Sequence, residues 1–231
     1  MRIAVLEDDF ILLELLQAAT ERLGHVCHTF TTGASLLTRL RRDTFDLLVV
    51  DWHLPDMEGP EVVRAVRKLS GPHMPILFVT RRQDEQDIIE ALASGADDFM
   101  SKPIRIGEFT ARIHALARRA YPHTGMATHV FGRYAFDLQE RTLALDGALL
   151  ELTDREFELA LFMFQNCGRL LSREHLREMV WGQVHDVPSR TMDTHVSRLR
   201  QKASLTPDHG FVITAVYGMG YRLEAVEAET A

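Results

Sequence analysis

Two different patterns of apolar and polar positions follow one another along the chain. Up to about residue 120, short apolar runs such as "FDLLVVD" and "MPILFVT" alternate with longer amphipathic stretches. The amphipathic stretches predict helices near residues 10–23, 33–42, 60–70, 84–94 and 106–119. Runs that are apolar throughout are typical of parallel strands covered on both faces. We therefore predict an α/β domain over residues 1–120, with a flavodoxin-like doubly wound (βα)5 fold.

The pattern changes after Arg119. Residues 121–129, "YPHTGMATH", show no period and are rich in proline, glycine and small polar residues, so we expect a linker there. Beyond it, the alternation around Asp146-Gly147 predicts a hairpin, and "FVITAVYGMGYRLE" predicts another. Between them, helices are expected near residues 153–166, 172–180 and 188–203, with Thr153 and Ser172 at helix starts. We predict a second, smaller α+β domain over residues 130–225 and a tail over residues 226–231.

Composition and charge narrow the classes of protein. The chain has 231 residues and a net charge of −7, with 15 basic against 18 acidic residues in 1–120 and 11 against 15 in 121–231. Neither half is basic, so any contact with nucleic acid must come from a local arrangement. No apolar run is long enough to span a bilayer, and "MRIAVLEDD" meets acids too soon for a secretory signal. Cys27 and Cys167 are far apart and are expected to be reduced thiols in a cytoplasmic protein.

Polar residues stand at the carboxyl ends of the predicted parallel strands, where ligands of doubly wound sheets bind. Glu7 and Asp8 follow the first strand, Asp51 the third, Thr80 the fourth and Lys102 the fifth. Clustered carboxylates repel one another, and a hard cation such as Mg²⁺ relieves this repulsion. A carboxylate beside a metal can attack a phosphoryl group. Each residue alone would more often be an ordinary cap, but the five together favour phosphorylation of Asp51, with Thr80 and Lys102 binding the phosphoryl group.

Four blocks, "VLEDD", "LLVVDWHLPDMEG", "ILFVT" and "GADDFMSKPI", resemble the signature blocks of response-regulator receiver domains. The resemblance covers nearly all of residues 1–119. It implies that Asp51 is both phosphoacceptor and metal ligand, and that Asp8 binds Mg²⁺ directly. It further implies that Glu7 acts through water and that His53 supplies a backbone carbonyl. Asp9 is a neighbour that can replace a member of the acid pair, and the sequence leaves this open.

The same resemblance implies a switch and exposes two departures. Thr80 and Phe99 would form the switch pair, and the peptide bond between Lys102 and Pro103 would be cis. Phe99 stands where tyrosine is frequent, so any signal that relies on that hydroxyl is absent. Arg81 follows Thr80 where relatives usually have a small residue, and a bulky cation there can restrict access to the phosphoryl group.

Residues 190–202, "RTMDTHVSRLRQK", form an amphipathic pattern in the second domain. Met192, Val196, Leu199 and Ala203 define an apolar stripe, and the opposite side is polar and basic. A solvated surface helix is the more common meaning of such a pattern. Here two shorter helices precede it and "AVYGMGYR", a glycine hairpin, follows it. This order resembles the winged-helix effector domain of OmpR/PhoB-type transcription factors across residues 131–223.

That resemblance implies contacts to double-stranded DNA. The residues concerned lie in or beside the recognition helix and in the wing: Arg190, Thr194, His195, Arg198, Arg200, Lys202, Tyr217 and Arg222. Residues 180–188 occupy the loop that the family uses to touch RNA polymerase. Tyr217 stands where some members have a wing arginine, so the wing supplies less charge here.

The combined expectation is a two-component response regulator, not an enzyme. A sensor histidine kinase would phosphorylate Asp51, and the added charge would favour a homodimer on paired DNA half-sites. Candidate residues for ion pairs across that dimer are Asp97, Asp98, Arg112 and Arg118.

Two alternatives compete with this expectation. A phosphatase that hydrolyses its own aspartyl phosphate would need a second acid two residues after Asp51, where the chain has His53. An interaction module that no longer takes phosphate would usually lack Asp51, Thr80 or Lys102, and all three are present.

Overall fold

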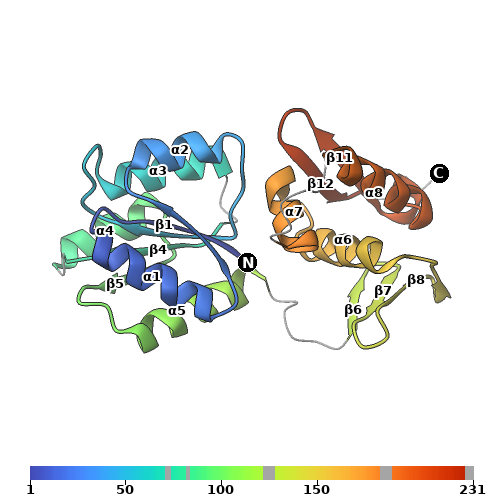
Figure 1. The fold of residues 1–231 in the computed structure, drawn as a ribbon, viewed down its shortest axis with the longest axis horizontal. Helices are drawn as coiled ribbons and strands as arrows, with labels where there is room; N and C mark the ends of the chain where they lie inside the picture. Colours follow the sequence, from blue (N-terminus) through green and yellow to red (C-terminus); the bar gives the residue numbers. More distant parts are fainter. Residues whose placement is uncertain (71–73, 82–83, 122–127, 183–188, 227–231) are drawn as a thin grey trace. The chain divides into compact units, whose positions relative to one another are not determined.

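The computed structural model describes the chain except for residues 71–73, 82–83, 122–127, 183–188 and 227–231. The chain forms two compact units, Met1–Pro122 and His123–Ala231, shown in Figure 1. Within the described residues, no helix has both the length and the apolar character needed to cross a membrane.

The described residues of the first unit form five parallel strands in the order β2-β1-β3-β4-β5. These strands are β1 (Arg2–Leu6), β2 (Val26–Phe30), β3 (Leu47–Asp51), β4 (Ile76–Thr80) and β5 (Asp98–Ser101). The helices that alternate with them are α1 (Phe10–Arg22), α2 (Gly33–Leu40), α3 (Gly59–Ser70), α4 (Glu85–Ser94) and α5 (Ile106–Ala120). The predicted flavodoxin-like doubly wound fold is therefore confirmed.

Two separate hydrophobic clusters cover the two faces of this sheet. One cluster joins β-strand residues to Leu16 of α1 and to Phe109 and Ile113 of α5. The other joins the opposite strand residues to Leu36 of α2 and Val63 of α3. Figure 1 shows α1 and α5 on one side of the strands and α2 and α3 on the other. Every residue of β1, β3 and β4 is buried, as the continuous apolar runs predicted.

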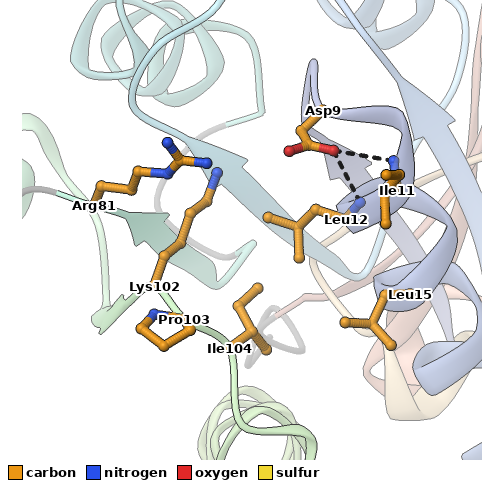
Figure 2. Close-up of a pocket in the computed structure, with 8 residues that line it drawn as sticks. All are labelled: Asp9, Ile11, Leu12, Leu15, Arg81, Lys102, Pro103 and Ile104. Carbon is orange, nitrogen blue, oxygen red and sulfur yellow. Dashed lines mark hydrogen bonds between the residues drawn. The ribbon is translucent and has the colours of Figure 1, made fainter.

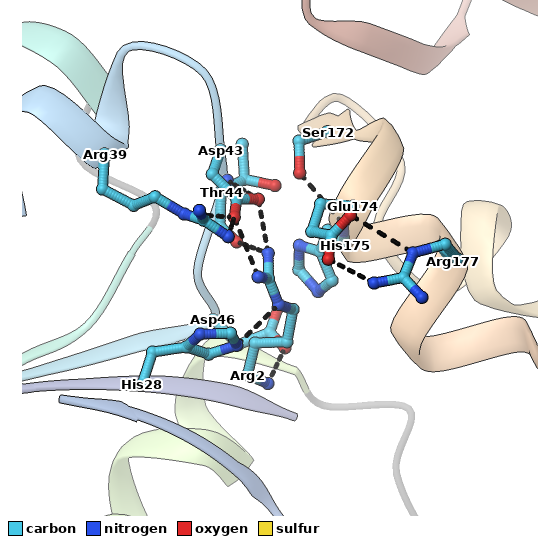
Figure 3. A network of polar contacts seen from close by, with 10 residues as sticks. All are labelled: Arg2, His28, Arg39, Asp43, Thr44, Asp46, Ser172, Glu174, His175 and Arg177. Carbon is cyan, nitrogen blue, oxygen red and sulfur yellow. Dashed lines mark hydrogen bonds and ion pairs between the residues drawn. The ribbon is translucent and has the colours of Figure 1, made fainter. Parts of the chain in front are cut away.

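The amino edge of the sheet holds a buried ion pair, shown in Figure 3. The guanidinium of Arg2 is fully buried and donates to Asp43 Oδ1 at 2.5 Å and to Asp43 Oδ2 at 2.9 Å. Arg39 also donates to Asp43, and the Arg2 amide donates to Asp46 Oδ2 at 2.8 Å. Arg2 therefore compensates buried acids at the edge of the sheet opposite the carboxyl ends of the strands.

The described part of the second unit contains two small antiparallel sheets and three α-helices. One sheet has the order β6-β7-β8-β9 and the other the order β10-β12-β11. The strands are β6 (Thr128–Phe131), β7 (Tyr134–Asp137), β8 (Thr142–Leu145), β9 (Ala148–Leu149), β10 (Leu170–Ser172), β11 (Phe211–Val216) and β12 (Gly220–Ala225). The helices are α6 (Asp154–Gln165), α7 (Arg173–Trp181) and α8 (Ser189–Lys202), with a short 3-10 turn η1 (Pro207–His209). This α+β arrangement matches the expected winged helix-turn-helix fold.

Local signals in the second unit behave as the sequence predicted. Thr153 and Glu156 form a capping box at the start of α6, and the Ser172 hydroxyl accepts from the His175 amide at 3.0 Å (Figure 3). Asp146 and Gly147 both have positive φ, 52° and 81°, as a two-residue hairpin turn requires. One boundary differs, because β6 begins at Thr128, inside the expected linker of residues 121–129. Pairing with β7 extends the strand beyond its apolar pattern.

Candidate functional site

The carboxyl ends of β1, β3 and β5 bring a lysine and two carboxylates into contact. The Lys102 ammonium lies 2.7 Å from Asp51 Oδ2 and 2.8 Å from Glu7 Oε2. The other oxygen of Asp51 accepts from the Trp52 amide at 2.6 Å. Asp51 and Glu7 are buried, so the single cation of Lys102 compensates two acids in a region of low dielectric constant.

Asp8 completes an acidic cluster with these residues. Carboxylate oxygens of Glu7, Asp8 and Asp51 all lie within 4.8 Å of one another, and Asp8 is exposed. Burial raises the pKa of Glu7 to about 7, the hydrogen bond from Lys102 opposes this, and the charge of Asp51 adds to it. Oxygen donors whose charges repel are the ligand set that a hard divalent cation favours. The residues therefore fit Mg²⁺.

Asp9 and His53, two further residues considered as metal ligands, lie in different local structures. Asp9 caps α1, because its Oδ1 accepts from the amides of Ile11 and Leu12 at 3.0 and 3.2 Å. This use of its carboxylate favours Asp8 over Asp9 as the second acid of the cluster. His53 lies two residues beyond Asp51 in an isolated β-bridge with Glu58, and its Nδ1 is 3.5 Å from Glu58 Oε1.

Thr80 and Phe99 lie on the adjacent strands β4 and β5. Thr80 is fully buried, and its carbonyl accepts from the Lys102 amide at 2.7 Å. Phe99 is half-buried and stands opposite Phe78 in the sheet register. The peptide bond between Lys102 and Pro103 is cis, as the family resemblance implied.

Gly59, the first residue of α3, lies against the backbone of Asp51. A Cβ atom added at Gly59 would be 2.5 Å from the Asp51 carbonyl oxygen and 2.7 Å from the Phe78 ring. The Gly59 amide donates to the Trp52 carbonyl at 2.7 Å. Only glycine allows α3 to start this close to the acid. Sequence reasoning missed this role because spacing along the chain does not reveal a backbone approach.

A pocket of about 610 Å³ opens beside Lys102. Its lining, shown in Figure 2, consists of Asp9, Ile11, Leu12, Leu15, Arg81, Lys102, Pro103 and Ile104. The walls are mostly apolar, with Arg81 and Lys102 as the two cations. The pocket therefore offers an anion two cations, of which Lys102 also contacts Asp51.

In the second unit, α8 presents a polar surface. Met192, Val196, Leu199 and Ala203 are buried, so the predicted apolar stripe is confirmed. On the outer side, Thr194 and Arg198 are exposed. Tyr217 is fully exposed at the β11–β12 turn. The side chain of Arg190 and residues 183–188 of the expected polymerase-contact loop lie outside the described residues.

Other candidates for DNA contact have partners within the second unit. Arg200 donates to the Ile213 carbonyl at 2.7 Å and lies over the Tyr221 ring. The Lys202 ammonium lies 2.7 Å from Oε2 of the buried Glu156. These contacts hold both cations to their own domain.

His195 and Arg222 also have contacts within the second unit. The His195 ring packs edge-on against Trp181, with the ring centroids 5.5 Å apart. Arg222 pairs with Glu224 at 3.4 Å.

Asp193, the acid of the recognition helix, is neutralised by residues that the sequence did not single out. Arg173, the first residue of α7, lies 2.6 Å from Asp193 Oδ1. The Tyr221 hydroxyl of β12 donates to the same oxygen, and the Arg173 guanidinium lies over the Tyr221 ring. Both contacts lower the pKa of Asp193 below its ordinary value. The cluster joins α7, α8 and the wing.

Three of the four residues expected at a dimer face, Asp97, Asp98 and Arg112, pair within the single chain. Arg112 lies 2.7 Å from Asp98 and 2.8 Å from Glu108, and Arg67 lies 2.7 Å from Asp97. Arg118 is exposed on α5. The sequence reasoning did not single out two large apolar side chains of α4, Ile89 and Leu92, which are 58% and 48% exposed.

Comparison with known proteins finds two families along the chain. Residues 3–114 match the family described as "Response regulator receiver domain", and residues 147–223 match "Transcriptional regulatory protein, C terminal". The transcriptional regulatory protein AfsQ1 of Streptomyces coelicolor is 35% identical over 95% of this chain and 96% of its own length. The phosphate regulon transcriptional regulatory protein PhoB of Rhizobium meliloti is 35% identical over 97% of this chain and 99% of its own. The response regulator protein PmrA of Pseudomonas aeruginosa is 34% identical, with 97% and 98% covered.

Proposed function

The chain belongs to the response regulators of OmpR/PhoB type, which join a receiver domain to a DNA-binding transcriptional regulatory domain, and from this premise we propose how it works. A partner sensor histidine kinase phosphorylates Asp51, and the phosphorylated protein binds DNA as a dimer in the cytoplasm. The observation that carries the proposal is the contact of the Lys102 ammonium with both Asp51 and Glu7 at the carboxyl edge of the sheet.

Phosphorylation of Asp51 follows from the charges around it. A carboxylate oxygen of Asp51 attacks phosphorus while the donor leaves, so Asp51 must be ionised and reachable. The Lys102 ammonium donates to Asp51 Oδ2 at 2.7 Å and provides a cation for the new phosphoryl oxygens. Glu7, Asp8 and Asp51 would hold Mg²⁺, with the His53 carbonyl as a further ligand. The bound ion neutralises negative charge on the phosphoryl oxygens.

The switch then involves Thr80, Phe99 and Lys102. A phosphoryl group adds between about −1.5 and −2 charge at pH 7 and accepts several hydrogen bonds. The Thr80 hydroxyl and Lys102 move toward it, and the half-buried Phe99 ring takes the space that Thr80 leaves. Because Phe99 has no hydroxyl, it would signal phosphorylation only through the position of its ring.

Dimerisation would use the surface of α4, β5 and α5. The exposed Ile89 and Leu92 supply apolar area, and Asp97, Asp98, Arg112 and Arg118 supply charges. Asp98 and Arg112 already bind each other within one chain, so a dimer would exchange rather than add these pairs. Because exposed ion pairs contribute little, the apolar pair is the stronger support.

On DNA, α8 would enter the major groove with Thr194 and Arg198 facing the bases. Arg190 and His195 would contact the groove edge, and Tyr217 and Arg222 the neighbouring backbone. Arg200 and Lys202 would reach phosphates only after leaving partners within the domain. A dimer joins two effector domains and so favours binding to paired DNA half-sites. Residues 180–188 would contact RNA polymerase.

We do not propose an enzyme. A phosphatase of the kind described would need a second acid at position 53, where His53 pairs instead with Glu58. A module that no longer takes phosphate is disfavoured by the intact set of Asp51, Thr80 and Lys102.

The test is phosphoryl uptake from acetyl phosphate with Mg²⁺, followed by intact-mass measurement. The wild-type chain should gain one phosphoryl group, and Asp51→Asn should gain none because the nucleophilic carboxylate is gone. Asp56→Asn, five residues away and engaged with the amides of Gly33 and Ala34, is the matched control and should label normally. Labelling of Asp51→Asn at the wild-type rate would reject the site.

A further inference from the structure

In the part of the chain that the structure describes, Arg81 is a cation without an ion-pair partner in the wall of the pocket beside Lys102. It follows Thr80 at the carboxyl end of β4, is exposed, and lines the same pocket as Lys102. Among the described residues, its guanidinium forms no ion pair or hydrogen bond. In the described part of this unit, Arg39, Arg67 and Arg112 each bind a carboxylate, whereas the exposed Arg41 and Arg118, like Arg81, do not. Arg81 differs from the latter two because it lines the pocket beside Lys102.

Asp9, the acid among the residues that line the pocket, already accepts hydrogen bonds from the start of α1. Figure 2 shows Arg81 and Lys102 together on one side, with Asp9 facing them and directed at the start of α1. The Asp9 carboxylate accepts from the Ile11 and Leu12 amides. Asp9 is therefore committed to capping, and the Arg81 guanidinium remains available to an incoming anion.

We propose that Arg81 binds the phosphoryl group, first on the donor and then on phosphorylated Asp51. The forked donors of a guanidinium match two phosphoryl oxygens, and Lys102 is shared between Asp51 and Glu7. With acetyl phosphate, an Asp51 oxygen forms a bond to phosphorus as the bond from phosphorus to the acetate oxygen breaks. Acetate leaves with the electron pair, no proton moves, and Arg81 offsets the charge on the transferring oxygens.

Binding the phosphoryl group differs from the restriction of access that the size of the Arg81 side chain suggested. A side chain that merely blocks the site slows every donor and is best removed. The pocket of about 610 Å³ has room for a small acyl phosphate with Arg81 in its wall, so the side chain lines the pocket rather than closing it. The inference rests on the proposed phosphorylation of Asp51.

The experiment compares Arg81→Met, which keeps length and removes charge, with Arg81→Lys, which keeps the charge. The matched control is Arg41→Met, an exposed arginine just beyond α2, near Asp43 at the amino edge of the sheet. Uptake from acetyl phosphate with Mg²⁺ is measured by intact mass at donor concentrations below saturation. Mg²⁺ binding without donor is measured by fluorescence of Trp52, next to Asp51, and thermal unfolding checks folding.

Arg81→Met should lower the uptake rate by roughly tenfold, the loss expected for one charge-assisted hydrogen bond, while Arg81→Lys keeps most of it. Removing a cation beside the acidic cluster should also tighten Mg²⁺ binding by roughly two- to threefold. Arg41→Met should change neither. Uptake that is unchanged or faster in Arg81→Met, or Mg²⁺ affinity that does not change, would overturn the proposal. Wild-type protein that takes up no phosphoryl group would instead reject the proposed function itself, and the proposal with it.

Discussion

Lys102 explains how two carboxylates can remain buried at the end of a hydrophobic sheet. One ammonium contacts both Glu7 and Asp51. A buried ion pair gains little over apolar packing, but losing one partner leaves an uncompensated charge that costs several kcal/mol, roughly 3–5. Lys102 is therefore needed for the acids as well as for phosphate, and a Lys102 variant would confuse stability with signalling.

His25 gives the receiver a stability that depends on pH. Burial lowers its pKa to about 4 from 6.5, the N-terminal amine and His114 act in the same direction, and Asp46 opposes them. Between pH 6.5 and 4, His25 is therefore protonated in the unfolded chain but neutral in the folded chain. The free energy of unfolding consequently falls as the pH falls through this window. We predict that His25→Gln removes on the order of 1–2 kcal/mol of the loss between pH 7.5 and 5.

The measurement is urea unfolding of both proteins at the two pH values, with His209→Gln, a histidine of η1 in the second unit, as the control. Equal losses in wild type and His25→Gln would contradict the assignment.

At the residue scale, the sequence predicted which residues end the strands but not every use of them. Asp51, Thr80 and Lys102 were predictable because strand ends of a parallel sheet share one edge. The capping role of Asp9 and the contact of Gly59 with the Asp51 carbonyl were not, because they depend on where the following helix begins.

At the scale of elements, α8 shows the limit of a helical wheel. The wheel predicted the buried stripe from Met192 to Ala203, since that depends only on period. The family resemblance implied DNA contacts from Arg200 and Lys202, yet both bind groups within the domain. Their partners, Ile213 and Glu156, are 13 and 46 residues away in sequence, beyond what periodicity along one helix can reveal.

This difference predicts contrasting outcomes on α8. Arg198→Ala should cost about 1–3 kcal/mol of binding at a specific site without changing stability, because Arg198 is exposed. Lys202→Met should instead destabilise the effector domain, because buried Glu156 would lose the cation that lowers its pKa.

Both variants are measured by DNA titration on a selected site and by thermal unfolding. Loss of stability in Arg198→Ala would contradict its role as an exposed DNA contact. Unchanged stability in Lys202→Met would contradict its role as the partner of Glu156.

At the scale of the whole molecule, the chain divides where its pattern changes. The structure separates Met1–Pro122 from His123–Ala231, and the three hydrophobic clusters each lie within one unit. The change of period after Arg119 made this division predictable. The start of β6 was not, because antiparallel pairing draws Thr128 and His129 into a strand without an apolar pattern.

We predict that a fragment of residues 1–122 takes up phosphoryl groups at a rate within about twofold of the full chain, since all site residues and both covering clusters lie in it. Intact-mass measurement with acetyl phosphate and Mg²⁺ checks this. A fragment that folds but labels far more slowly would show that the site needs the second unit.

Tyr121 marks where the receiver can be divided from its output in chimeric proteins. Its hydroxyl donates to the Asp46 carbonyl at 2.8 Å and fastens the end of the receiver beside the start of β3. A fusion joint placed after Tyr121 keeps this hydrogen bond. A joint placed at Arg119 removes it, and the last turn of α5 should then fray. Biosensors that graft this receiver onto a foreign reporter should therefore keep the tyrosine.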